Sequence, residues 1–282
     1  MFEVIFLFVL GLIWIIFAVV QDLKTREIAN WLNFSLIVFA LGFRFFYSLF
    51  FEANFNFFIQ GLVGLGVFFV LGNLFYYSKL FAGGDSKLMI ALGPILPILD
   101  RTTENLKFLL FFMMVFLAAG FLYILFFIFY LAIKNFKKFK PEFKKQFKKT
   151  RKYVIPLTIL AILFLIAGFF INQAVYFAIY LLVLVYLVII SKSVDESCMI
   201  KKMKTSELTE GDWLYQSIAI KGEKINANWS GLNAAEINLL KKNKKEVLIR
   251  QGIQFAPVFL ISFVLTFVLF KIGVFEILFR LI

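Results

Sequence analysis

Histidine is absent from the sequence, and cysteine occurs once, at Cys198. Without histidine, Ser-His and Cys-His nucleophilic catalysis and histidine-ligated zinc are excluded. With one cysteine, an intrachain disulfide and a cysteine-rich metal site are excluded as well. Cys198 lies in a polar region without a histidine base, so we interpret it as a surface or packing residue. A glycine-rich cofactor loop is also missing, and we expect neither a cofactor nor a metal.

Apolar residues, by contrast, make up 62% of the 282 residues, and phenylalanine alone occurs 41 times. Repeated apolar runs of about twenty residues predict membrane-spanning helices. The first run has no small-residue cleavage site behind it, so we expect a retained helix and not a signal peptide. The predicted fold is an all-α polytopic membrane protein with about eight transmembrane helices and a small cytoplasmic insertion. The expected spans are 2–20, 31–51, 57–77, 88–99, 108–133, 153–171, 174–190 and 253–272.

Several residues within these spans predict local packing. The span at 88–99 is short and contains Pro94 and Pro97, so we expect it to be broken or re-entrant, with its backbone satisfied by protein or water. Arg44 lies in the outer half of the second span, where we expect its side chain to reach the outer interface. Glycines recur at partly helical spacing in the third span and predict close helix packing. They are Gly61, Gly64, Gly66 and Gly72.

Basic residues alternate with the spans, and the net charge is +13. Positive charge follows the first, third and fifth spans, which predicts an external amino terminus and cytoplasmic basic loops. The stretch 134–152 has ten Lys or Arg residues against one acid, Glu142. It is expected to bind anionic lipid headgroups, or alternatively to dock an acidic partner. An aromatic-basic recognition motif is lacking, so we expect no nucleic-acid partner.

One long polar region interrupts the hydrophobic sequence, with eleven basic and eight acidic side chains at 191–252. We therefore predict three parts of the chain. Residues 1–190 form a membrane core, residues 191–252 form a cytoplasmic domain, and residues 253–282 form the final transmembrane helix and a tail. The middle part is too small to build a large core, so docking on the membrane part is expected.

Asp22 and Asp85 are the candidates for chemistry. Each follows a long apolar segment and begins an Asp-x-Lys triplet. The predicted topology puts both at the cytoplasmic face of the membrane. Two carboxyl groups at one depth can share a proton and activate a water molecule, as in an aspartic protease.

Four neighbouring residues are candidate supporting residues. Gly83 and Gly84 precede the second aspartate and provide a flexible, close approach. Lys24 and Lys87 complete the two triplets. Each lysine either stabilises the ionised pair, binds substrate, or extends to lipid phosphate.

The aspartate segments resemble the two motifs of type IV prepilin and preflagellin peptidases. Residues 22–30, Asp-Leu-Lys-Thr-Arg-Glu-Ile-Ala-Asn, resemble the first motif, and residues 82–87, Ala-Gly-Gly-Asp-Ser-Lys, resemble the Gly-x-Gly-Asp motif. The carboxy-terminal part of the chain resembles that of one archaeal group of these peptidases. The residues that carry this resemblance are 207–214, 231–232 and 252–257. The chain departs from the pattern at Ala82, in place of the first glycine, and at Ala29, in place of a proline often found there.

The resemblance implies a membrane aspartic endopeptidase of archaeal origin, with Asp22 and Asp85 as its catalytic residues. Its expected substrates are type IV pilin-like or archaellin-like precursors, cleaved between a basic leader and a hydrophobic helix at the cytoplasmic face. Methylation is not implied, because the cysteine-rich region of many bacterial relatives is missing. The rival interpretation is a proton- or cation-coupled transporter that uses the two aspartates. A noncatalytic membrane assembly protein is a third interpretation.

Overall fold

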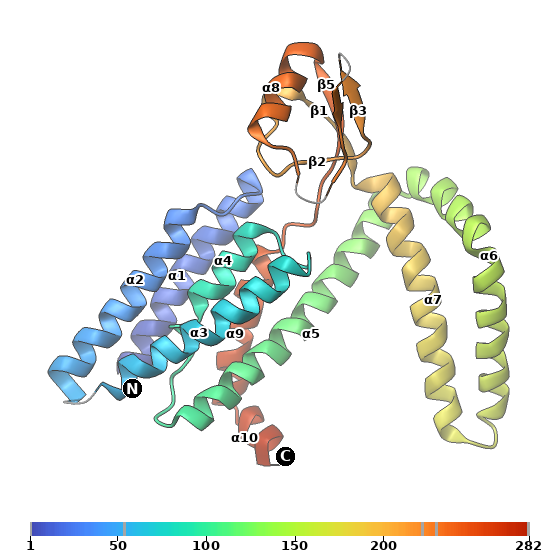
Figure 1. Ribbon diagram of the computed structural model, residues 1–282. Coiled ribbons are helices and arrows are strands. Elements are labelled where there is room, and N and C mark those ends of the chain that lie inside the picture. The colour runs from blue at the N-terminus through green and yellow to red at the C-terminus, as the bar shows by residue number, and fades with distance from the viewer. Residues whose placement is uncertain (1, 53–54, 221–222, 229–230, 281–282) are drawn as a thin grey trace. The chain divides into compact units, whose positions relative to one another are not determined.

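The computed structural model describes residues 2–52, 55–220, 223–228 and 231–280 (Figure 1). The chain divides into two compact units, one of residues 1–123 and 254–282 and the other of residues 124–253. The first unit is built from helices. They are α1 (Phe2–Thr25), α2 (Asn30–Tyr47) with a π-helical turn at Ser48–Glu52, α3 (Asn56–Tyr77), α4 (Gly83–Leu92), α5 (Thr102–Lys134, which continues into the second unit), α9 (Ala256–Lys271) and α10 (Val274–Arg280).

Among the described residues, six helices are long and apolar enough to cross a membrane. They are α1, α2 with its π-helical turn, α3, α5, α6 (Phe136–Ala167) and α7 (Asn172–Cys198). The shorter α9 is also apolar. The expected class of helical polytopic membrane protein is thereby confirmed. The expected span at 88–99 differs, because α4 has ten residues, which is roughly 15 Å of helix against a hydrocarbon thickness of about 30 Å. In place of about eight crossing helices, the described chain has six long ones and a shorter one.

Arg44 holds the chain where α4 ends. Pro94 and Pro97 follow the helix, and a proline cannot donate the backbone hydrogen bond that would continue it. Arg44 is fully buried, and it donates from Nε to Pro94 O at 2.7 Å, from Nη1 to Phe57 O at 2.8 Å, and from Nη2 to Pro97 O. The expectation that Arg44 reaches the outer interface is wrong. Its guanidinium instead satisfies carbonyl groups around the helix break, which was itself expected from the prolines.

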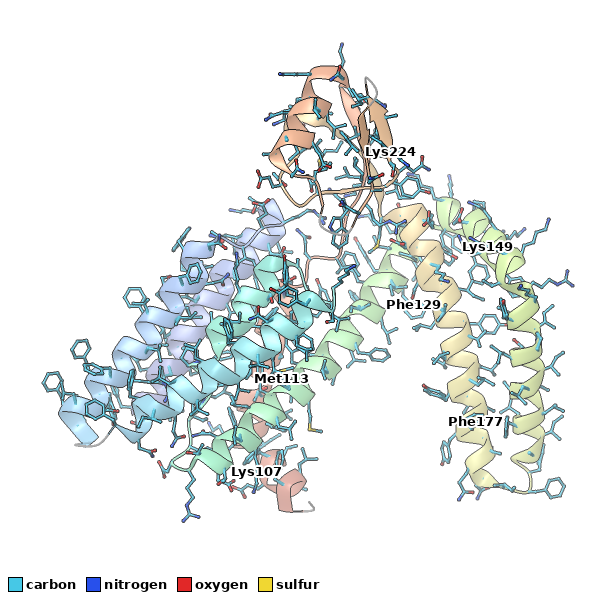
Figure 2. All side chains as sticks on the ribbon, viewed as in Figure 1. Lys107, Met113, Phe129, Lys149, Phe177 and Lys224 are labelled. Atoms are coloured by element: carbon cyan, nitrogen blue, oxygen red, sulfur yellow. The ribbon has the colours of Figure 1, made fainter. Side chains whose placement is uncertain are left out.

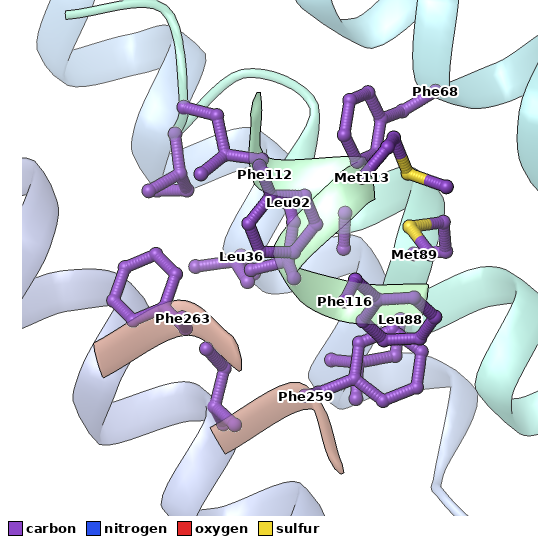
Figure 3. Packing of buried hydrophobic residues seen from close by; sticks show 14 of the residues in the cluster. Leu36, Phe68, Leu88, Met89, Leu92, Phe112, Met113, Phe116, Phe259 and Phe263 are labelled. Atoms are coloured by element: carbon purple, nitrogen blue, oxygen red, sulfur yellow. The ribbon is translucent and has the colours of Figure 1, made fainter. Parts of the chain in front are cut away.

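Phenylalanine fills the centre of the first unit (Figure 3). Phe116 of α5 packs against Phe259 of α9 with ring centroids 4.8 Å apart. Phe68 of α3 packs against Phe112 of α5 at 5.8 Å. Leu88 of α4 is buried in the same cluster. Apolar packing therefore fixes α4, the helix that carries the second aspartate, against its neighbours.

Glycines on α3 allow α4 and its exit turn to approach closely. A Cβ atom at Gly64 would stand 2.2 Å from the carbonyl oxygen of Gly93. A Cβ atom at Gly72 would stand 2.9 Å from the carbonyl oxygen of Ser86. The expected close packing is confirmed at these two glycines. A Cβ atom at Gly66, in contrast, would meet nothing within 4 Å.

The second unit combines the α6–α7 hairpin with a small α/β region. Phe177 of α7, which is labelled in Figure 2, packs edge-on against Phe164 of α6 with ring centroids 4.8 Å apart. One antiparallel sheet has the order β1-β5-β2, and β3 pairs with β4 in another. The elements are β1 (Ile200–Lys204), a 3-10 turn (Thr205–Glu207), β2 (Trp213–Leu214), β3 (Ile218–Ile220), β4 (Glu223–Ile225), α8 (Ala234–Asn243) and β5 (Glu246–Arg250).

An ion-pair cluster joins the end of β5 to the end of α7. Arg250 Nη1 lies 3.1 Å from Asp195 Oδ2, and Arg250 Nη2 lies 2.8 Å from Glu196 Oε1. Tyr215 donates its hydroxyl to Glu196 Oε2 at 2.9 Å. Because α7 continues to Cys198, beyond the expected end of the span at 190, its last turns provide both acids. The cluster thus fixes the sheet on the polar end of the hairpin.

Candidate active site

Asp22 lies in the last turn of α1 and is buried, with 7% of its surface exposed. Just beyond the helix, Arg26 adopts the left-handed conformation, with φ of 62°, and its N–H donates to the Asp22 carbonyl at 2.9 Å. The N–H of Ala29 then donates to Gln21 Oε1 at 3.0 Å. These bonds fold the α1–α2 connection back onto the end of α1. Ile28, which belongs to this connection, is buried.

Asp85 lies in the first turn of α4, next to this connection. A Cβ atom at Gly84 would stand 3.3 Å from Ile28 Cβ, so the start of α4 closely approaches the connection. Two residues beyond Asp85, Lys87 Nζ donates a 2.6 Å hydrogen bond to Asn30 Oδ1. Lys87 and Asn30 are 57 residues apart in the sequence. The bond between them shows that the two motif segments meet at one end of the first unit.

The two glycines before Asp85 have different surroundings. Both belong to the first turn of α4, where a regular helix replaces the expected flexible approach. A Cβ atom at Gly83 would make only an ordinary contact, 3.8 Å from Tyr76 Cε2. At Gly84 the space is tighter, because Ile28 lies against it. The small residue that the close approach requires is therefore Gly84.

The two lysines of the triplets also differ. Lys24 is exposed in the last turn of α1, where a positive charge interacts favourably with the helix dipole. Lys87 bonds to Asn30 and so links the second aspartate segment to the first. This contact makes Lys87 the better candidate for a supporting residue.

The electrostatic environment of Asp85 connects the two aspartates. Burial raises the pKa of the Asp85 carboxyl to about 7, and the negative charge of Asp22 is the second cause. Asp85 lies outside the six long apolar helices. A carboxyl pair with this interaction holds one proton between them near neutral pH. The ionised member can then accept a proton from water while the protonated member polarises a carbonyl group.

Two further contacts of Asp22 come from the far end of the sequence. Gln254 Nε2 donates to the Asp22 carbonyl at 2.7 Å, and the N–H of Ala256 donates to Asp22 Oδ2 at 3.0 Å. Sequence reasoning placed neither residue at the site. The resemblance of residues 252–257 to archaeal peptidases was the one signal that could have indicated them.

A metal-binding arrangement is not formed within the described ranges. Among those residues, no group of three or more His, Cys, Asp or Glu side chains could hold a metal ion.

Part of the chain is similar to known peptidases. Residues 9–128, which contain both aspartates, match the type IV leader peptidase family. The preflagellin peptidase of Methanocaldococcus jannaschii is 36% identical over 90 residues, 32% of this chain and 38% of that relative. The preflagellin peptidase of Methanococcus maripaludis is 32% identical over 90 residues, with the same coverage of 32% and 38%. The match thus spans 38% of the length of each relative. No solved structure matches the chain significantly.

Proposed function

We propose that the chain is a membrane aspartic endopeptidase, because residues 9–128 match the type IV leader peptidase family. Its proposed substrates are archaellin-like and pilin-like precursors, because similar proteins bear the name preflagellin peptidase. The observation that carries the proposal is the meeting of the two aspartate segments, joined by the Lys87–Asn30 hydrogen bond. Asp22 and Asp85 are the proposed catalytic residues.

The proposed reaction is hydrolysis of a peptide bond by an activated water molecule. The ionised carboxylate takes a proton from water as the water oxygen bonds to the scissile carbonyl carbon. At the same time the protonated carboxyl group gives its proton to the carbonyl oxygen. Collapse of the tetrahedral intermediate breaks the C–N bond, and the proton taken from water passes to the leaving amine. The carboxyl group recovers its proton from the intermediate, so the pair returns to its initial state.

The surroundings of the site suit a basic leader followed by a hydrophobic helix. The carboxyl pair carries a negative charge that attracts a basic leader. Large apolar side chains are exposed at the start of α2, including Trp31, Phe34 and Val38. The hydrophobic helix of a precursor could pack laterally against this surface within the bilayer. Cleavage would then take place between the leader and the helix.

The proposed orientation follows from the basic loops. With positive charge on the cytoplasmic side, Asp22 and Asp85 face the cytoplasm, where the leader of an unprocessed precursor is found. Residues 1–190 form the membrane core, residues 191–252 form the cytoplasmic domain, and residues 253–282 form the final helix and tail. The basic residues 134–152, which lie mainly on α6, are proposed to bind anionic lipid headgroups.

A proton- or cation-coupled transporter has less support. Among the described residues, Asp22 and Arg44 are the buried charged side chains. Arg44 is occupied by backbone carbonyl groups at the end of α4. A conducting path would need further polar or ionisable groups along the spans. The family match also points to a peptidase and gives the transporter no support.

Cleavage in detergent tests the proposed activity. The purified protein is mixed with the preflagellin of Methanocaldococcus jannaschii or with a pilin-like precursor, and the new amino terminus is identified by mass spectrometry. We expect removal of the leader without any membrane gradient. The preflagellin peptidase of the same organism serves as the positive control. Intact precursors in reactions where the control enzyme cleaves them would contradict the proposal.

A further inference from the structure

Three consecutive residues before and at the start of α9 contact the end of α1 and the residue that precedes the second aspartate segment. We call Gln254, Phe255 and Ala256 the aspartate clamp. Gln254 Nε2 donates to the Asp22 carbonyl at 2.7 Å, and the buried Ala256 N–H donates to Asp22 Oδ2 at 3.0 Å. These bonds span 232 and 234 residues of sequence. One oxygen of the Asp22 carboxyl group is therefore held by a backbone donor.

The middle residue of the clamp contacts Phe81, the residue immediately before the second aspartate segment. Phe255 packs against Phe81 with ring centroids 5.6 Å apart and against Phe116 of α5 at 5.9 Å. Phe81 lies four residues before Asp85. The same short segment thus bonds to the end of α1 and packs against the entry to α4. Movement of the clamp would change the separation of the two carboxyl groups.

The clamp is itself held from another side. Tyr123 of α5 donates its hydroxyl to the Gln254 carbonyl at 3.1 Å. Pro257 follows Ala256 in the first turn of α9, where its fixed φ favours the start of a helix. The Ala256 N–H is one of the amino-terminal donors of α9 that have no acceptor within the helix. Asp22 provides that acceptor, and its negative charge is favoured at this end of a helix.

We propose that the aspartate clamp positions Asp22 as the ionised member of the catalytic pair, so that Asp85 carries the shared proton. This inference rests on the proposed peptidase function and assigns roles that the function alone leaves open. Asp22 accepts a proton from the attacking water, and Asp85 donates its proton to the scissile carbonyl oxygen. Gln254 is a positioning residue, because it acts through Asp22 and not on the substrate. The Ala256 N–H stabilises the ionised form of Asp22, because it donates to a carboxyl oxygen of that residue.

Substitution of Gln254 tests the proposal. Gln254→Leu replaces the amide with an apolar side chain of similar size and so removes the donor to the Asp22 main-chain carbonyl. We expect kcat for preflagellin cleavage to fall about tenfold with KM little changed, since Gln254 holds the main chain of Asp22 and its loss affects the alignment for reaction more than substrate binding. A loosened clamp also weakens the Ala256 N–H bond to the Asp22 carboxylate, so the acidic limb of the pH–rate profile should move to higher pH. Gln254→Asn, whose amide is retained on a shorter side chain, should recover part of the rate.

Two further variants separate positioning from simple loss of stability. Tyr123→Phe removes only the hydroxyl that holds the Gln254 carbonyl, and it should change kcat and the pH profile in the same direction, by about threefold. Gln251→Leu is the matched control, because Gln251 Oε1 has no hydrogen-bond partner in the described part of the chain. It should leave kcat and the pH profile unchanged.

The outcomes distinguish this inference from the proposed function. Wild-type kcat and pH profiles in Gln254→Leu and Tyr123→Phe, alongside inactive Asp22→Asn and Asp85→Asn, would overturn the clamp while the peptidase assignment stands. Active aspartate variants would instead overturn the proposed function. If Gln254→Leu does not fold, as judged by size-exclusion chromatography, Tyr123→Phe decides the question by the same criteria.

Discussion

Lys87 donates a 2.6 Å hydrogen bond to Asn30, and this bond joins the first turns of α4 to the first residue of α2. The two residues belong to the segments that carry Asp85 and Asp22, respectively. The bond is exposed to solvent, which screens the charge of the lysine and limits the contribution of the bond to stability. It provides a direct way to measure how firmly the two aspartate segments are held together.

Removal of either partner should slow cleavage by a common mechanism. We expect Lys87→Met and Asn30→Ala each to reduce the cleavage rate severalfold, because the carboxyl pair loses alignment. A double-mutant cycle should give a coupling energy of about 1 kcal/mol. Lys24→Met should have a smaller effect, since Lys24 is exposed on α1. Fully additive effects of the Lys87 and Asn30 substitutions would show that the bond does not contribute.

Two glycines of α3 provide a matched test of helix packing. Gly64→Ala places a methyl group 2.2 Å from the Gly93 carbonyl oxygen, and we expect it to cost about 1–3 kcal/mol by overpacking. Gly66→Ala meets nothing within 4 Å and should be neutral or stabilise the helix by up to about 1 kcal/mol. Thermal unfolding in detergent measures both. Equal unfolding temperatures for the two variants would contradict the close approach of α3 to Gly93, the residue that follows α4.

The pH dependence of cleavage should follow Asp85. Its pKa is raised from 3.8 to about 7, so the folded protein retains a proton in this interval that the unfolded chain has lost. Stability from this group therefore decreases as pH rises from 3.8 to about 7. Because Asp85 acts as the proton donor, kcat should fall as pH rises above about 7. A kcat that stays constant through the alkaline range would argue against this role.

Cys198 provides a test of orientation without an added reporter. It lies at the end of α7 and is partly buried. An impermeant thiol reagent should label it in inverted membrane vesicles and not in intact cells. In a Cys198→Ser background, Lys201→Cys gives a second, exposed reporter nearby. Labelling of either cysteine from outside intact cells would reverse the proposed topology.

Sequence patterns predicted the helical membrane class because apolar run length directly reflects the thickness of the bilayer. They also predicted a break near Pro94 and Pro97, since proline removes a helix donor. Arg44 was misplaced for a physical reason. Hydropathy estimates the depth of a side chain but does not reveal acceptors that arrive from elsewhere in the chain, and here those acceptors include two proline carbonyls.

Only part of the candidate site could be predicted from the sequence. Asp22 and Asp85 could be selected from their repeated setting after apolar segments. The Lys87–Asn30 bond and the contacts of Gln254 depend on helix packing across 57 and 232 residues, which a single sequence does not encode as a local pattern. The roles of these residues stay predictions, to be decided by kinetics.

Single-turnover cleavage by Asp22→Asn and Asp85→Asn tests the two-aspartate mechanism most directly. Asparagine keeps the size of the side chain but cannot exchange the catalytic proton. Each purified variant should keep the wild-type elution volume and leader-peptide affinity, while its cleavage rate falls by at least about a thousandfold. Near-normal cleavage by either variant, in a preparation free of wild-type enzyme, would contradict the mechanism.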